Sequence, residues 1–202
     1  GIARDYKFEV IYPGLQDLDQ YPKTDAQNAL DLNQNKKYLV FVGRLTTIKR
    51  PERLIDLARF LKDKHPECWL LIAGAGELLE ILSAQAQREE LPATFLGWRK
   101  DIGTILSASD IAVLCSDNEG IPLTLIQAAQ GGLPIVSTDV GSVSDIVING
   151  TTGLLTEVSS KGLVEGVSVL LDDPDLGLSF GRAGKERARE FFSSRTMVEH
   201  HE

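Results

Sequence analysis

Short runs of apolar and β-branched residues alternate along the chain with longer segments in which apolar residues recur every three or four positions. This alternation is typical of βαβ units, in which helices connect the strands of a parallel sheet. The short runs predict strands at residues 7–12, 38–42, 69–73, 94–96, 111–115, 134–137 and 153–155. We therefore expect an α/β fold with a parallel sheet of about six strands and helices on both faces.

The longer segments carry one apolar stripe each and predict helices. They cover residues 51–64, 77–90, 122–130, 161–171 and 174–192. In the first of them, Leu54, Leu57, Ala58 and Leu61 fall on one side of a helix. Residues 16–37 differ, because they are polar and rich in Asn and Gln, and they predict a loop or a frayed segment.

Composition and charge exclude several classes of protein. The 202 residues are 43% hydrophobic and 25% charged, which is ordinary for one large globular domain. The formal net charge of −8 argues against a nucleic-acid groove. No apolar run approaches the roughly 18–20 residues that span a bilayer. Cys68 and Cys115 lie in or beside apolar runs and are predicted to be buried free thiols of a cytoplasmic protein. The three histidines have no metal-ligand spacing.

In an open parallel sheet, the loops that follow the strands gather along one edge, and ligands bind there. Arg44 and Lys49 follow the strand predicted at residues 38–42. A guanidinium can bind two phosphate oxygens at once, and an ammonium adds a compact charge, so the pair suits a diphosphate. Taken alone, two such loop cations are more often simply solvated. Both interpretations stay open at this point.

The run Glu119-Gly120-Ile121-Pro122 leads into the helix predicted at residues 122–130. Glycine allows a close backbone approach to a ligand, and Pro122 suits a first helical turn. The free N–H groups of such a helix start favour phosphate or sugar hydroxyls, and those of Gly120, Ile121 and Leu123 are candidates. Glu119 either accepts hydrogen bonds from sugar hydroxyls or caps the helix.

Two further loops at the same edge have glycine or aromatic residues. Gly74-Ala75-Gly76 resembles the start of a dinucleotide-binding fingerprint, but Leu79 occupies the third glycine position. A tight turn that closes one end of the crevice is the better interpretation. Trp98 and Arg99 offer an aromatic plane or a guanidinium on which a base can stack, although Trp98 also fits a core or rim position.

Taken together, the loop motifs resemble the carboxyl-terminal domain of retaining glycosyltransferases of the GT-B fold, family 4 or group 1, which is Rossmann-like. The resemblance runs from about residue 10 to residue 202, and each motif is common alone but specific in this order and spacing. The motifs are residues 42–45 with 49, 71–76, 95–97, 108–111, 116–120, 128–131 with 134–136, and 149–155.

This resemblance implies transfer of a hexose from a nucleotide diphosphate sugar to an acceptor, with retention and without a metal or other cofactor. It assigns the catalytic positions to Arg44, Lys49 and Glu119. In the family a second Glu, separated from the first by seven residues, contacts the ribose hydroxyls, whereas this chain has Gln127 there. The residues expected to bind the donor are Gly43, Gly74, Trp98, Arg99, Gly120, Ile121, Pro122, Leu123 and Gln127.

Enzymes of this fold have two Rossmann-like domains, and residues 1–202 correspond to one of them. Residues 193–202 resemble the family's terminal helix, which crosses back to the first domain. We therefore expect a fragment whose partners are a nucleotide sugar and the absent N-terminal acceptor domain, with any peripheral membrane contact made through that domain and none with nucleic acid. We expect the isolated domain to be inactive. A non-catalytic nucleotide-sugar-binding or assembly module, an epimerase and a phosphorylase remain as alternatives.

Overall fold

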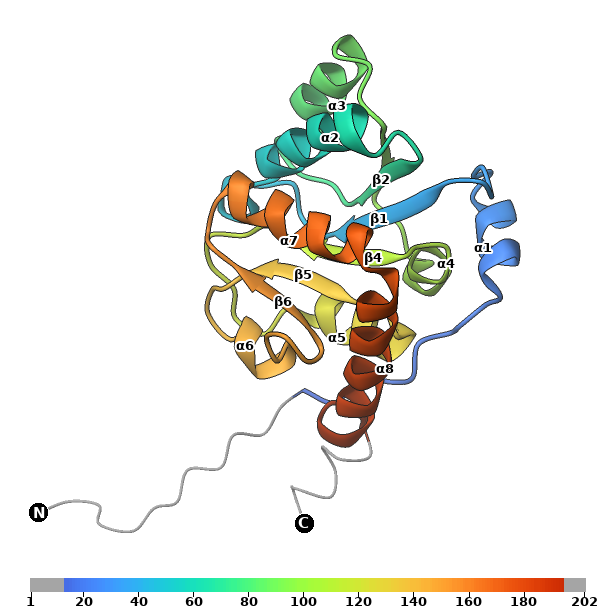
Figure 1. Ribbon diagram of the computed structural model, residues 1–202, viewed down its shortest axis with the longest axis vertical. Coiled ribbons are helices and arrows are strands. Elements are labelled where there is room, and N and C mark those ends of the chain that lie inside the picture. Colours follow the sequence, from blue (N-terminus) through green and yellow to red (C-terminus); the bar gives the residue numbers. More distant parts are fainter. Residues whose placement is uncertain (1–12, 195–202) are drawn as a thin grey trace, which may run out of the picture.

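Six strands form one sheet in which every neighbouring pair is parallel (Figure 1). The computed structural model describes residues 13–194. The strand order across the sheet is β3-β2-β1-β4-β5-β6. The strands are β1 Lys37–Val42, β2 Cys68–Ala73, β3 Ala93–Gly97, β4 Ile111–Leu114, β5 Ile135–Thr138 and β6 Gly153–Thr156. The predicted parallel sheet is thus confirmed, while the strand expected at residues 7–12 lies outside the described residues.

The centre of the sheet is apolar on both sides. Tyr38, Leu39, Val40 and Phe41 of β1 are all buried, which is the pattern of a strand covered on both faces. On one side β1 pairs with β2, and on the other side it pairs with β4. Strands β2 and β3 are thus added on one side of β1, and β4, β5 and β6 on the other side, so that the strand order switches between β1 and β4. In folds of this kind, such a switch point opens a crevice at the carboxyl ends of the two strands.

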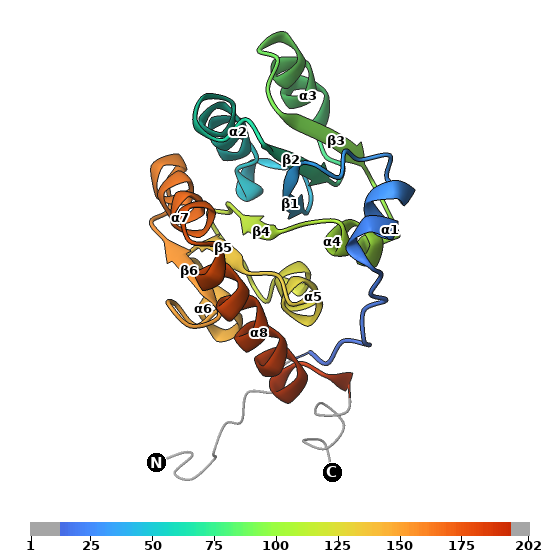
Figure 2. The same cartoon turned by 45° about the vertical axis from the view of Figure 1, so that its right-hand side comes forward.

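Helices cover both faces of the sheet, as expected (Figure 2). Helices α2 and α7 pack together on one face, while α4 and α5 lie on the other, and α8 runs along α5 near β6. The helices are α1 Lys23–Ala29, α2 Glu52–Lys64, α3 Leu79–Arg88, α4 Ile102–Ser107, α5 Leu123–Gly131, α6 Val143–Ile146, α7 Ser160–Asp172 and α8 Pro174–Phe191, with a 3-10 turn at Thr47–Lys49.

Helix α2 shows why the apolar pattern was sufficient for the long helices. Leu54, Leu57, Ala58 and Leu61 are completely buried against the sheet, as the stripe predicts. Burying one leucine side chain contributes about 1.5–3 kcal/mol, so this stripe fixes the face that the helix presents to the core. The stripe of α5 is less regular, because Leu123 at its first position is 46% exposed.

The loop expected at residues 16–37 is wrong in part, because α1 lies within it. Two contacts attach this polar helix to the rest of the fold. The side chain of Gln27 is buried and donates a hydrogen bond to the carbonyl of Ala108, and Lys23 pairs with Asp110 at 2.5 Å. Hydrogen bonds to residues some 80 positions away leave no periodic signal in the sequence. The short elements α4, α6 and the 3-10 turn likewise went unpredicted.

Both cysteines are free and buried, as expected from their apolar surroundings. Burial raises the pKa of the Cys68 thiol to about 12, and it raises the pKa of Cys115 as well. A raised pKa favours the protonated thiol at neutral pH, which agrees with the prediction that both cysteines are buried free thiols. No helix within residues 13–194 has the length and apolar character needed to cross a membrane.

Candidate functional site

Two loops meet at the switch point, one after β1 and one after β4. They enclose a hollow of about 220 Å³. Arg44 and Lys49 line this hollow from the first loop, and Glu119 lines it from the second. The structure therefore places the two candidate cations and the candidate acid around one space, although Lys49 and Glu119 lie 70 positions apart in the sequence.

The carboxylate of Glu119 is held firmly. Both of its oxygens lie 2.6 Å from the ammonium of Lys49, and the hydroxyl of Ser116 donates a hydrogen bond of 2.6 Å to Oε1. The side chain of Glu119 is only 5% exposed, and a carboxylate is tolerated there because it is paired and hydrogen-bonded. These contacts leave it no part in capping α5, whose N-cap is Pro122.

The two cations of the site differ in what they already bind. Lys49 is paired with Glu119, whereas the guanidinium of Arg44 is exposed and has no ion pair or hydrogen bond within residues 13–194. Arg44 also lines a second hollow on its other side. The structure thus offers one uncommitted positive charge and one that a ligand must share with a carboxylate.

Two glycines allow the loops of the site to approach each other. Gly74, in the turn after β2, has a φ of +154°, and a Cβ there would lie 1.8 Å from the carbonyl oxygen of Gly43. Gly141, in the loop after β5, has a φ of +53°, and a Cβ there would lie 1.8 Å from the carbonyl oxygen of Glu119. Any other residue at either position would displace a site loop.

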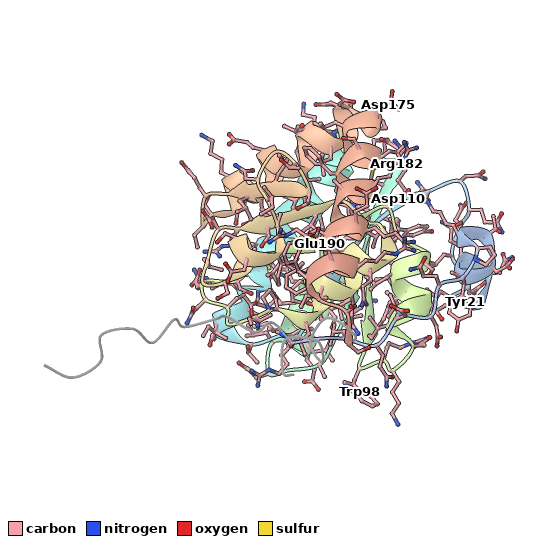
Figure 3. All side chains as sticks on the ribbon, turned by 90° about the horizontal axis from the view of Figure 1, so that it is seen from below. Tyr21, Trp98, Asp110, Asp175, Arg182 and Glu190 are labelled. Carbon is pink, nitrogen blue, oxygen red and sulfur yellow. The ribbon has the colours of Figure 1, made fainter. Side chains whose placement is uncertain are left out.

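The second hollow, of about 440 Å³, adjoins the first through Gly43 and Arg44 and includes Gly74. Trp98 and Arg99 line its far side. Trp98 is 68% exposed, so it is not a core residue, and Figure 3 shows it pointing outward.

The charged residues that follow Trp98 make two kinds of contact, one with its ring and one with each other. The ammonium of Lys100 lies 5.5 Å from the centre of the Trp98 ring. Arg99 makes two hydrogen bonds to Asp101, at 2.8 and 2.6 Å. Those hydrogen bonds lower the pKa of Asp101 and raise the pKa of Arg99. The guanidinium of Arg99 is therefore already engaged, and the ring of Trp98 is the accessible planar group of this loop.

Gln127 lies apart from Glu119. It is half-buried on α5 and lines a third hollow of about 620 Å³, together with residues 14–19 and Lys100. Ile102 borders both the second and the third hollow. The three spaces thus adjoin one another, with Glu119 at one end and Gln127 at the other.

The start of α5 faces the first hollow. Ile121, Pro122 and Leu123 line this hollow, and the helix has no side-chain cap within the described part of the chain. Its first N–H groups therefore remain available to a ligand. Gly120 precedes them in the same loop, and a Cβ there would meet nothing within 4 Å.

Sequence reasoning missed two residues that shape the site. Ser116 is completely buried and binds Glu119, although its sequence position suggested no role. Arg53 is 6% exposed, lies on α2 and binds the loop after β4. It occurs among other polar residues of an amphipathic helix, so no sequence pattern distinguishes it. Within residues 13–194, no group of three or more His, Cys, Asp or Glu side chains is placed to hold a metal ion.

Comparison with known proteins identifies the family of the chain. The model of the family described as "Glycosyl transferases group 1" matches residues 22–187. The chain belongs to this family.

Characterised relatives match most of the chain. An alpha-maltose-1-phosphate synthase of Mycolicibacterium smegmatis is 32% identical over 209 residues, which cover 93% of this chain and 53% of the relative. A D-inositol 3-phosphate glycosyltransferase of Corynebacterium aurimucosum is 31% identical over 199 residues, covering 90% of this chain and 47% of the relative. The chain spans about half the length of these curated relatives.

Solved structures share the fold at lower identity. Alr3699/HepE of Anabaena, in complex with UDP-glucose, has a TM-score of 0.84 and 24% identity over 95% of this chain and 55% of that protein. The C-terminal domain of a group 1 glycosyl transferase, LpcC of Francisella tularensis, has a TM-score of 0.75 and 20% identity over 92% of this chain and 97% of that domain. The fold is that of the C-terminal domain of GT-B enzymes.

Proposed function

We propose that this chain is the donor-binding half of a cytoplasmic, two-domain hexosyltransferase that uses a nucleoside diphosphate sugar and retains the anomeric configuration. The observation that carries this proposal is the placement of Arg44, Lys49 and the buried Glu119 around one hollow at the switch point. Family membership supports it, and so does the likeness to HepE, which was solved in complex with UDP-glucose.

The two cations suit the diphosphate of the donor. Arg44 is uncommitted and presents a planar guanidinium that can bind two oxygens of a phosphate group. Lys49 has three N–H donors, so its ammonium can bind phosphate while it still contacts Glu119. When the sugar leaves, negative charge grows on the diphosphate, and preplaced cations that stabilise such charge lower the barrier by several kcal/mol.

Glu119 and the start of α5 suit the sugar. The carboxylate is fixed by Lys49 and Ser116, so its orientation is set before the donor binds. An ionised carboxylate accepts strong hydrogen bonds from hydroxyl groups. The N–H groups at the start of α5 add donors beside it. No metal ion and no protein nucleophile takes part in this proposal, since the cations already meet the developing charge.

The second and third hollows suit the nucleoside. The exposed ring of Trp98 offers a face on which a base can stack. Gln127 can hydrogen-bond ribose hydroxyls through its amide, without the added strength of a charged acceptor. The ribose joins the diphosphate to the base, so the donor would extend along the carboxyl edge of the sheet from its sugar at Glu119, through the diphosphate at Arg44 and Lys49, to a nucleoside held between Gln127 and Trp98.

Gln127 also favours a second candidate, a module that binds nucleotide sugars without catalysis. A neutral amide at the position where the family has Glu should bind the ribose more weakly than a carboxylate does. Such a loss is compatible with a module that binds the nucleotide sugar but does not transfer the sugar. The two candidates differ in whether the protein that contains both domains consumes the donor. Release of nucleoside diphosphate on addition of acceptor supports the transferase, whereas donor binding without release supports the module.

Calorimetric titration tests donor binding directly. UDP-, GDP- and ADP-glucose are titrated into the wild-type chain and into Arg44→Ala, with Arg182→Ala on α8, remote from the hollows, as the matched control. We expect one of the three donors to bind the wild type and the control equally, and to bind Arg44→Ala at least about tenfold more weakly, because a charge-assisted hydrogen bond is lost. Equal heats in all three proteins, or none, would refute the proposal.

A further inference from the structure

Arg53 is a buried charge outside the hollows. Its Nη1 donates a hydrogen bond of 2.7 Å to the carbonyl of Cys115, and its Nη2 donates one of 2.6 Å to Oδ1 of Asp117. Nη2 also lies 3.2 Å from the carbonyl oxygen of Val158, in the loop between β6 and α7. A guanidinium is costly to bury unless such acceptors surround it. One side chain of α2 therefore connects to two loops that are distant from it in sequence.

Asp117 also contacts the loop that connects β1 to α2. Its backbone N–H donates to the carbonyl of Ile48 at 3.0 Å, and its Oδ2 lies 3.1 Å from Nε of Arg50. The contact with Arg50 is a charge attraction, since that N–H is not aligned for a hydrogen bond. Arg50 itself has a left-handed φ of +50° between Lys49 and the start of α2. Asp117 thus joins the loop after β4 to the loop that carries Lys49.

These contacts hold residues 115–117, which precede Glu119 in the loop after β4. Cys115 and Asp117 are both bound by Arg53, and Glu119 follows two residues later. Arg53 in turn belongs to the helix that begins just after Lys49. The same guanidinium therefore sets the spacing between the loop of the acid and the loop of the cations.

We propose that Arg53 and Asp117 are a positioning pair, which holds the loop of Glu119 against the loop of Arg44 and Lys49 and so sets the affinity for the donor. The part of this inference that concerns the donor rests on the proposed function. Neither residue lines the hollow, so both act through Glu119 and Lys49.

A purely stabilising role would not need this chemistry. The side chain of Arg53 is 8% exposed, whereas that of Asp117 is 44% exposed. At the buried position of Arg53, an apolar side chain of similar volume would stabilise the fold as well or better, because a buried charge loses its hydration. A guanidinium with three directed hydrogen bonds instead fixes the relative orientation of the groups it binds. The pair is therefore better suited to setting geometry than to adding stability.

The experiment compares Asp117→Asn with Asp56→Asn in the 202-residue chain. Both changes remove the charge of an aspartate that pairs with an arginine of α2. Asp56 is the control because it pairs with Arg59 and accepts a hydrogen bond from Ser160, away from the site. Three quantities are measured for each variant: the melting temperature, the hydrogen exchange of backbone amides 115–121, and the affinity for UDP-, GDP- and ADP-glucose by calorimetry.

We expect Asp117→Asn to weaken donor binding by about tenfold and to speed exchange in residues 115–121 more than in the rest of the sheet, which separates loosening of this loop from global unfolding. Its melting temperature should fall below that of Asp56→Asn, because the buried charge of Arg53 loses its countercharge. Asp56→Asn should leave both the exchange of this loop and the affinity as in the wild type. Unchanged loop exchange in Asp117→Asn would overturn the inference. Faster loop exchange with unchanged donor affinity would overturn its functional part.

Arg53→Lys provides the second arm, because lysine keeps the charge but cannot make the same three directed contacts. We expect its loop exchange and affinity to lie between those of the wild type and Asp117→Asn. If the wild type binds none of the three donors, the proposed function fails, and hydrogen exchange alone then decides whether the pair holds the loop.

Discussion

At the scale of single residues, the proposed donor site requires one ammonium, that of Lys49, to serve both a carboxylate and a diphosphate. Glu119 binds Lys49 through both oxygens and is itself fixed by Ser116. A diphosphate that reaches Lys49 therefore competes with the carboxylate for the same charge. In the complex that we propose, the carboxylate would accept hydrogen bonds from the sugar but would repel the diphosphate. Glu119 should consequently have opposite effects on the two parts of a donor.

This opposition predicts the behaviour of Glu119→Gln. The amide no longer neutralises Lys49, so the affinity for a nucleoside diphosphate alone should stay the same or rise. The affinity for the nucleotide sugar should fall by about tenfold, because hydrogen bonds to a charged acceptor contribute about 1.5–3 kcal/mol. Calorimetry with UDP and UDP-glucose measures both effects, and Glu165→Gln on α7, which is well exposed, serves as the control. An equal loss for both ligands would contradict this view of the site.

Gln127 leads to a prediction of the opposite sign. Gln127→Glu places an ionised acceptor in the third hollow, near Lys100. Since charge-assisted hydrogen bonds are roughly twice as strong as neutral ones, a donor whose ribose lies there should bind several-fold more tightly. The gain should appear for nucleoside diphosphates with and without a sugar, as measured by thermal shift. An unchanged affinity in the variant would mean that the nucleoside does not contact residue 127, and a weaker affinity would mean that residue 127 lies nearer the diphosphate than the ribose.

At the scale of elements, the loops of the site are held by neighbours that carry no functional side chain. Gly141→Ala tests this support. A Cβ at this position meets the carbonyl oxygen of Glu119 at 1.8 Å, and φ is +53°. We expect donor affinity to fall together with a loss of stability of about 2–4 kcal/mol, which combines left-handed strain and overpacking. Chemical denaturation and calorimetry measure the two effects.

Gly150→Ala is the matched control for that change. Gly150 also has a positive φ, of +73°, but a Cβ there meets nothing within 4 Å. It should therefore cost only the backbone strain, about 1–2 kcal/mol, and leave donor affinity unchanged. If the two variants lose the same stability and keep the same affinity, the loop after β5 does not support Glu119.

The elements that sequence reasoning predicted are those whose folding is driven by a continuous apolar stripe. The stripe of α2 and the apolar run of β1 each identify one buried surface, so their type and place follow from the chain alone. Helix α1 was missed because polar contacts hold it, such as the hydrogen bond from Gln27 to Ala108. Such contacts depend on residues that become neighbours only in the folded chain.

The candidate site was likewise predictable from the sequence in part. Arg44, Lys49 and Glu119 follow strands of a parallel sheet, so topology alone predicts that they share an edge. What sequence reasoning could not supply is which charges are already paired. The engagement of Arg99 by Asp101 and the burial of Arg53 against Asp117 are tertiary facts, and they decide which guanidinium remains open to a ligand.

At the scale of the whole molecule, the segments at the two ends of the described chain lie side by side. The N–H of Leu15 donates to the carbonyl of Phe192, and the N–H of Ser194 donates to the carbonyl of Leu15. The donor hollows and this paired segment both belong to one compact sheet domain. All the residues to which we attribute donor binding thus lie in this one domain, while the curated relatives that the chain matches are about twice as long.

We therefore expect the 202-residue chain to bind a nucleotide sugar without transferring it. The cations and the acid would act on the donor, but transfer also requires an acceptor hydroxyl held against the sugar, and such positioning of a second substrate contributes about 7–11 kcal/mol to catalysis. Mixing the chain with radiolabelled donor and a panel of hydroxyl acceptors should give binding and no product. Supplying the chain joined to an N-terminal domain from a group 1 relative should give product, and Arg44→Ala should abolish it. Rapid transfer by the 202 residues alone would show that this domain also holds the acceptor.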